Sequence, residues 1–371
     1  MRGKLVIIAA VLSLMLTGCA VELGDVPGML FPSEDINEST APHGEDMTAE
    51  QLYDLFTGEL RQYRTKVTIR GSISAELITE TMDAIQRRAP DIFWIDGYTI
   101  TTGSRTTEVV FDSIDSLTPV RLREMSAELE AAADELISQI PEDMLDYDKI
   151  LYIHDTIIRS TTYDQKGSGA GKNGLWGTAY GCLVNGDAIC QGYSEAFVYI
   201  MGKLGIEAGM CSGTARNERH AWNYVKLGAE YYWIDLTWDD PESTDDTEDI
   251  GPEGYLRHTY FLINDEMLLR TRTIDPDQDY IPECSSIANN YFVRSNSYFD
   301  TYSIEALGWV MLQNAGSRSV EVMFSDSETF EYAVCRLFDD GDIWETGEYL
   351  SLADKISYSR DDVMLVLTIN Y

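Results

Sequence analysis

The sequence predicts an α+β protein in which helices pack on an antiparallel sheet, with a small β-α-β-β module on either side of this core. Amphipathic helical stripes occupy residues 119–140 and 146–160 of the 371-residue chain. A strand–turn–strand pattern covers residues 220–238. The order strand, helix, strand, strand occurs near both ends, and this repetition predicts two related flanking modules.

The first 18 residues predict a signal peptide. Arg2 and Lys4 precede an apolar run over residues 5–16 that is too short to span a bilayer comfortably. The run ends in Leu-Thr-Gly-Cys at residues 16–19, which resembles the lipobox where bacterial lipoproteins are cleaved before a lipidated cysteine. We therefore expect lipid on Cys19 to anchor the protein at the extracytoplasmic face of the cell membrane. An ordinary secretory signal with a chance cysteine is the alternative.

Residues 19–46 predict a flexible tether, because they are rich in Pro, Gly, Ser, Asp and Glu and lack periodicity. The N-terminal module follows over residues 47–117, and the C-terminal module covers residues 286–371. Ser74 is the expected cap of the first module's helix, and Pro90 stops that helix. The C-terminal module has its expected helix at 327–338. The expected strands of the two modules lie at 65–70, 92–101, 106–112, 320–324, 349–358 and 363–370.

The charge balance excludes several classes of partner. The chain has 63 Asp and Glu residues against 27 Lys and Arg residues, which gives a formal net charge of −36. Such a surface repels the phosphates of DNA and RNA and offers no polybasic patch to anionic lipids. The hydrophobic fraction of 44% is enough for a packed core. We therefore expect a folded protein that binds no nucleic acid and meets the membrane only through its lipid.

Residues 118–285 form the predicted central domain. Thr118 and Pro119 are a typical N-cap and first helical residue for its first helix. His154 lies on the apolar face of the second helix, which favours a core histidine held by a hydrogen bond over a catalytic one. The glycine-rich residues 165–174 lack the spacing of a phosphate-binding loop, so we expect a mobile loop there.

A third helix is predicted to begin at or just after Cys190. The apolar residues that follow recur with helical spacing, and Gly205 suits the left-handed position beyond the helix end. A thiol at a helix N-terminus faces unpaired N–H groups and the positive end of the helix dipole. That position favours the thiolate and supplies donors to an oxyanion. A buried structural cysteine is the alternative interpretation.

The predicted hairpin supports a nucleophilic role for Cys190. A turn centred on residues 228–229 pairs residue 222 with residue 235, which puts His220 and Asp235 on one face as diagonal neighbours, about 7–8 Å apart at Cα. A carboxylate in so aromatic a strand needs a donor, which the Nδ1–H group of His220 supplies. Asp235 then orients the imidazole, and His220 accepts the thiol proton.

These motifs resemble the core of the transglutaminase-like superfamily. The resemblance covers about residues 148–265 and implies a papain-like α+β fold that performs acyl transfer, with Cys190 as nucleophile, His220 as base and Asp235 as the residue that orients it. The matching segments are 153–155, 163–164, 177–180, 190–194 (Cys-Gln-Gly-Tyr-Ser), Gly213, 220–223 (His-Ala-Trp-Asn) and 233–241 (Trp-Ile-Asp-Leu-Thr-Trp-Asp-Asp-Pro).

Other residues near these motifs are expected to complete the site. The group that joins the Cys190 N–H in holding an oxyanion is not fixed by the sequence, and Trp176 and Tyr180 are candidates. Further candidates for the oxyanion or substrate pocket are Gln191, Tyr193 and Trp222. The resemblance also implies three structural residues that fix turns beside the site, namely Asn223, Asp239 and Asp240.

No metal site or other cofactor is predicted. Eukaryotic relatives use calcium, but the acidic stretches at 245–251 and 275–280 lack the spacing of a calcium loop. The chain has only four histidines and no Cys-x-x-Cys pair, so no zinc site is indicated. Lipidation of Cys19 would leave five of the six cysteines, and an odd number implies at least one free thiol.

We therefore expect an extracytoplasmic thiol acyltransferase or hydrolase that acts on glutamine carboxamides or peptide bonds of protein or cell-wall peptide. Crosslinking, deamidation and proteolysis share their first half-reaction, so the sequence leaves them open. The alternative class is a non-catalytic cell-surface binding lipoprotein built on a relic transglutaminase fold. An intact Cys, His and Asp at the family spacing argue against that class.

Overall fold

The chain divides into two compact units, residues 1–131 with 171–175 and residues 132–170 with 176–371. Among the described residues, no helix combines the length and the apolar character that a membrane crossing requires. Cys19, nearly all of the expected tether and loop, and the acidic residues 242–254 lie outside the described residues. The structure is a computed structural model that describes residues 5–9, 44, 47–103, 105–164, 174–241, 255–276, 278, 280–348 and 356–371.

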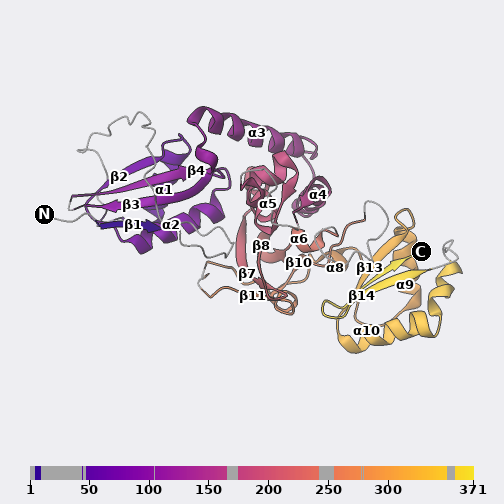
Figure 1. Ribbon diagram of the computed structural model, residues 1–371. Coiled ribbons are helices and arrows are strands. Elements are labelled where there is room, and N and C mark those ends of the chain that lie inside the picture. The colour runs from indigo at the N-terminus through magenta and orange to yellow at the C-terminus, as the bar shows by residue number, and fades with distance from the viewer. Residues whose placement is uncertain are drawn as a thin grey trace. The chain divides into compact units, whose positions relative to one another are not determined.

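The first unit contains the expected N-terminal module. Its sheet has the order β1-β3-β4-β2 with antiparallel neighbours, and α1 packs against α2 (Figure 1). Ser74 caps α2 as expected, because its Oγ accepts the Leu77 N–H at 3.1 Å. The elements are β1 (Leu5–Ala9), α1 (Ala49–Leu60), β2 (Lys66–Arg70), α2 (Ala75–Arg88), β3 (Ile95–Thr102), β4 (Thr106–Ser113) and the 3₁₀ turn η2 (Ile114–Ser116).

The strand β1 falls inside the segment that the sequence predicts as a signal peptide. In the full chain these residues form an edge strand antiparallel to β3, with Leu5 opposite Thr102 and Ala9 opposite Tyr98. Cleavage of the signal peptide would remove β1. The other three strands of the sheet, in the order β3-β4-β2, would remain paired. The signal peptide stays a prediction.

The helix α3 (Pro119–Ser138) begins at the predicted residue and runs across the boundary between the two units. The Oγ1 atom of Thr118 accepts the Arg121 N–H at 3.3 Å, which satisfies a donor in the first turn. Pro119 lacks an N–H group, so it costs the first turn nothing. Both sequence signals for the start of this helix are therefore confirmed.

The second unit is built around a five-stranded antiparallel sheet of order β10-β9-β8-β7-β11, on which α5 packs, with α4 against α5 (Figure 1). Phe197 of α5 is fully buried, as are Trp222 and Trp233, which belong to a core cluster with Tyr260, Met267 and Phe292. The elements are α4 (Asp146–Ser160), β5 (Thr162–Tyr163), η3 (Leu175–Gly177), the π-helical turn η4 (Gly181–Asn185), β6 (Asp187–Ala188), α5 (Cys190–Lys203), β7 (Ala208–Ala215), β8 (Glu218–Leu227), β9 (Glu230–Ile234), α6 (Leu236–Asp239), β10 (Phe261–Ile263), α7 (Asp265–Leu268) and β11 (Arg272–Ile274).

The C-terminal part of the second unit repeats the order of the first module. In both, the last strand is central and pairs antiparallel with the other two, as β2-β4-β3 and as β13-β15-β14. The strand expected at 349–358 begins only at Ser357 in the described residues. The elements are α8 (Tyr291–Arg294), β12 (Tyr298–Phe299), α9 (Ile304–Gln313), β13 (Ser319–Phe324), α10 (Ser327–Val334), the π-helical turn η5 (Cys335–Asp339), η6 (Asp342–Glu348), β14 (Ser357–Asp361) and β15 (Val366–Asn370).

The fold is thus α+β, as the sequence predicts. An antiparallel sheet covered by helices forms the centre, and the two β-α-β-β arrangements occur at the two ends of the chain. A helix that the sequence analysis did not anticipate precedes each of them, α1 in the first and α9 in the second.

Candidate active site

Cys190 is the first residue of α5. The preceding residue, Ile189, is extended, and its N–H donates to the Trp176 carbonyl at 3.0 Å. Gly192 lets this first turn approach the same carbonyl, because a Cβ at Gly192 would lie 2.6 Å from the Trp176 oxygen. The thiol is therefore fixed at a helix N-terminus, where first-turn N–H groups have no partner within the helix.

The hairpin has the predicted register. Leu227 lies opposite Glu230 and Asn223 opposite Ile234, so the turn is the two residues 228–229. His220 is 6% exposed. Its partner across the other edge of β8 is Gly213, where a Cβ would lie 2.0 Å from the Thr273 carbonyl oxygen. Only glycine at position 213 leaves room for β11 to pair with β7, the strand beside the one that carries His220.

His220 and Asp235 form a hydrogen-bonded pair, but through a different ring nitrogen than expected. The Nε2 atom of His220 lies 2.8 Å from Oδ2 of Asp235. The assignment of Nδ1 to this contact is therefore corrected. Because Nε2 is engaged by the carboxylate, Nδ1 is the nitrogen left for the thiol of Cys190, with which His220 shares a side-chain hydrogen bond.

Asp235 ends the strand that was expected to continue to residue 238. The strand β9 stops at Ile234, and Asp235 is the N-cap of the short helix α6. Its Oδ1 accepts the Trp238 N–H at 3.2 Å. Asp is a strong N-cap residue, and the strand assignment failed because this local bond competes with strand pairing.

Arg272 is a further member of the site that the sequence analysis missed. Its side chain is fully buried, its Nε donates to Asp235 Oδ2 at 3.1 Å, and its Nη2 forms an ion pair with the same oxygen. The guanidinium lies 4.0 Å from the Tyr260 ring centroid and 4.3 Å from that of Trp238. Thirty-seven residues separate Arg272 from Asp235, so no local motif signals the contact.

The electrostatics of the three residues favour a thiolate–imidazolium pair. Burial raises the pKa of the Cys190 thiol. The hydrogen bond and the charge of His220, together with the Ala221 N–H, outweigh the effect of burial, so the pKa is lowered overall. Burial lowers the pKa of His220, but the Asp235 carboxylate and the Cys190 thiolate together raise it to about 9. Burial opposes ionisation of Asp235, yet His220 and Arg272 hold its pKa well below the usual range.

The other described cysteines differ from Cys190. All are free thiols. Burial raises the pKa of Cys182 to about 12, and burial also raises the pKa of Cys211 and Cys284. Cys335 is exposed, and its pKa is raised as well, by desolvation and then by neighbouring carboxylates. Cys190 is thus the one described cysteine whose surroundings favour the thiolate.

Most of the expected pocket residues lie in the interior. Tyr193 is fully buried, and its hydroxyl donates to Asp240 at 2.7 Å. Trp222 is also fully buried and stacks on His220 with ring centroids 5.8 Å apart. Both are core residues, and their assignment to a substrate or oxyanion pocket stays a prediction.

The remaining expected residues surround the first turn of α5. Tyr180 is buried just before η4, and Gln191 donates to Glu195 at 3.0 Å within the helix. Trp176 contributes its carbonyl, which receives the Ile189 N–H. Asn223 donates to two backbone carbonyls, those of Ser194 and Gly209. These contacts hold the helix and the sheet together beside the thiol.

The fold and the site together define a class of protein. In this class, a thiol at a helix N-terminus, an imidazole and a buried carboxylate meet beside an antiparallel sheet. Residues 131–237 match the sequence model of the transglutaminase-like superfamily. The matched segment contains Cys190, His220 and Asp235, whereas Arg272 lies outside it.

Two solved structures are similar at low identity. One is a crystal structure of a TGase, 14% identical, with a TM-score of 0.29 over 51% of this chain and 54% of that one. The other is a Cytophaga hutchinsonii protein provisionally assigned as a cysteine protease, 14% identical, with a TM-score of 0.25 over 37% and 56%. The chain thus spans little more than half the length of each of these two proteins. No curated protein matches the sequence.

Proposed function

We propose that the protein is a thiol acyltransferase or hydrolase of the transglutaminase-like type, which acts on glutamine carboxamides or peptide bonds of protein or cell-wall peptide. One observation carries the proposal. The thiol of Cys190, whose pKa is lowered, hydrogen-bonds with His220, and His220 is held at 2.8 Å by the buried carboxylate of Asp235. This is the nucleophile, base and orienting group that thioester chemistry requires.

In the first half-reaction, the Cys190 thiolate attacks the substrate carbonyl carbon, a C–S bond forms, and the carbonyl oxygen becomes an oxyanion. The unpartnered N–H groups at the start of α5 stabilise that charge. His220 then gives its proton to the leaving nitrogen, and the C–N bond breaks. Ammonia or an amine departs, and a thioester and a neutral imidazole remain.

In the second half-reaction, an amine or water attacks the thioester while neutral His220 takes its proton. The C–S bond breaks, and the thiolate and imidazolium are restored. An amine acceptor gives a crosslink, whereas water gives deamidation or peptide cleavage. Asp235 keeps Nε2 of the imidazole engaged in both steps, so that Nδ1 stays directed at the reacting atoms.

We further propose that this chemistry takes place outside the cytoplasmic membrane, with the protein held by lipid on Cys19. The basic residues, apolar run and Leu-Thr-Gly-Cys sequence of residues 2–19 support this placement. Mass spectrometry of the mature protein is expected to find a lipidated N-terminal Cys19. An unmodified N-terminus at any other residue would contradict it.

The activity is tested by incubating the full chain with a glutamine-containing protein and a labelled amine, with Cys190→Ala as the control. Amine uptake, release of ammonia alone and peptide cleavage identify transferase, deamidase and protease activity respectively. The proposal expects one of the three, and expects Cys190→Ala to abolish it. The absence of Cys190-dependent turnover in all three assays would refute it and favour a non-catalytic binding protein.

A further inference from the structure

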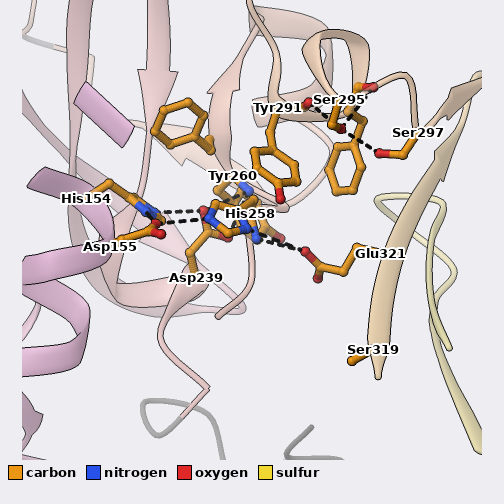
Figure 2. A network of polar contacts seen from close by, with 12 residues as sticks. His154, Asp155, Asp239, His258, Tyr260, Tyr291, Ser295, Ser297, Ser319 and Glu321 are labelled. Atoms are coloured by element: carbon orange, nitrogen blue, oxygen red, sulfur yellow. Dashed lines mark hydrogen bonds and ion pairs between the residues drawn. The ribbon is translucent and has the colours of Figure 1, made fainter. Parts of the chain in front are cut away.

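A second group of buried polar side chains lies outside the chemistry proposed for Cys190. We call it the histidine–carboxylate cluster, and Figure 2 shows its members pointing toward one another from separate parts of the second unit. It comprises His154 and Asp155 of α4, Asp239 at the end of α6, His258 in the segment before β10, and Glu321 of β13. No step of acyl transfer uses them.

Three donor atoms of this cluster converge. Oδ1 of Asp155 lies 3.0 Å from Nδ1 of His154 and 3.0 Å from Nε2 of His258. All three atoms lie within 4.8 Å of one another. Zinc ligands stand about 2.0–2.1 Å from the ion, which separates neighbouring tetrahedral ligands by roughly 3.4 Å. Oδ1 of Asp155 is already slightly closer than this to each nitrogen, so small shifts of the three side chains bring the three atoms to the spacing of a metal site.

The outer nitrogens of both imidazoles face carboxylates. His154 Nε2 lies 3.2 Å from Asp239 Oδ2, and His258 Nδ1 lies 4.0 Å from Glu321 Oε2. A metal-binding histidine usually directs its second ring nitrogen at a carboxylate or a carbonyl, which fixes the tautomer and makes the ligating nitrogen a better donor. His154 has this outer partner at hydrogen-bond distance, and for His258 the Glu321 carboxylate stands at ion-pair distance.

Neighbouring groups hold these outer partners in place. Asp239 accepts the Tyr260 N–H at 2.9 Å, and Glu321 accepts the His258 N–H at 3.0 Å. The His258 ring stacks on Tyr291 with centroids 4.0 Å apart and planes 8° apart. The imidazoles are therefore prearranged rather than free to turn away.

The charges and the exposure of the cluster also suit a cation. Three carboxylates share this interior with two imidazoles, and a divalent ion would neutralise the excess negative charge. The second oxygen of Asp155 faces Arg159 at 3.4 Å, which leaves Oδ1 for the cluster. The Asp155 side chain is 18% exposed while His154 is fully buried, so an ion and a fourth, water ligand can enter beside Asp155.

We propose that His154, Asp155 and His258 bind a divalent transition-metal ion, zinc by preference, with Asp239 and Glu321 as supporting partners. Two imidazole nitrogens and one carboxylate favour zinc and its neighbours over calcium or magnesium, which take oxygen ligands. The ion joins α4 to the segment before β10, and Glu321 extends the contact to β13. No local sequence motif indicates this site, because His258 lies 103 residues from Asp155.

The test measures metal directly on the full chain. After chelator treatment and dialysis, zinc is titrated by calorimetry, and cobalt is added separately as an optical probe. We expect one equivalent to bind, with a cobalt spectrum of nitrogen and oxygen ligands and no thiolate band. Asp155→Asn and His258→Gln should abolish binding, and Glu321→Gln should weaken it about 10–100-fold.

Cys190→Ala is the matched control, because a thiol and His220 could themselves bind zinc. Binding that persists in Cys190→Ala and disappears in Asp155→Asn supports the proposal. Loss in Cys190→Ala with retention in Asp155→Asn would overturn it, as would the absence of zinc binding to the wild-type chain at micromolar concentration. Circular dichroism checks that each variant is folded. If the ligand variants unfold, Glu321→Gln, which keeps all three ligands, replaces them as the test: weakened zinc binding supports the proposal, and unchanged binding contradicts it.

Discussion

Replacing Asp235 by Asn should damage stability and turnover for separable reasons. Asparagine caps a helix about as well as aspartate, so α6 keeps its N-cap. The lost charge is the partner of both His220 and Arg272. Arg272 has no exposed side-chain surface, so it is left as a buried charge without its anion. Breaking a buried ion pair from one side costs about 3–5 kcal/mol, and we expect the second unit to lose that much.

A paired variant separates the two effects. Asp235→Asn combined with Arg272→Met removes both charges, and apolar replacement of a buried pair is often close to neutral. We expect this double variant to recover to within about 1–2 kcal/mol of the wild type. Turnover should stay reduced about 10²–10⁴-fold in both variants, because the amide does not hold the imidazolium.

Urea unfolding followed by tryptophan fluorescence measures the stability, with acyl-transfer assays alongside. Fluorescence reports mainly on the second unit, because Trp94 alone of the seven tryptophans lies in the first. The reasoning fails if Asp235→Asn unfolds at the same urea concentration as the wild type. It also fails if the double variant is less stable than the single one, or if Asp235→Asn retains full turnover.

Three further predictions follow from the site. Limiting iodoacetamide should label Cys190 before the other described cysteines, since its pKa alone among them is lowered; mass spectrometry that finds another site labelled first contradicts the nucleophile assignment. Turnover should rise with pH as the Cys190 thiol ionises, and this rise should occur at a lower pH than for an ordinary thiol. Turnover should then fall near pH 9, where His220 loses its proton. A profile that still rises at about pH 10 would exclude the imidazolium as proton donor. Gly192→Ala should cost about 1–3 kcal/mol, because its Cβ would lie 2.6 Å from the Trp176 carbonyl oxygen, whereas Gly202→Ala, where a Cβ meets nothing within 4 Å, should be neutral or stabilising. Equal unfolding midpoints for these two variants would refute that packing argument.

Much of the fold followed from local signals. The Thr118 and Pro119 pair placed the start of α3, Ser74 placed that of α2, and the two-residue turn at 228–229 set the register that brings His220 to Asp235. The helix α1 was missed although Thr48 and Gln51 form a capping box ahead of its apolar residues. That signal is local and was available in the sequence.

What the sequence did not reveal depends on tertiary contacts. Arg272 reaches Asp235 from a strand at the opposite edge of the sheet, and His258 reaches Asp155 from beyond the acidic segment. The choice of Nε2 on His220 depends on the angle at which the ring leaves β8, which periodicity does not specify. The ending of β9 at Ile234 was decided by one cap bond from Asp235.

The most direct test of the central claim is capture of the acyl-enzyme. The full chain is mixed with a substrate that it turns over, quenched in acid within the first turnover, and analysed by intact-mass and peptide mass spectrometry. The account predicts a thioester on Cys190, with a mass equal to the substrate less its departed amine or ammonia, and no adduct in Cys190→Ala. An adduct on another residue, or turnover that persists in Cys190→Ala, would contradict it.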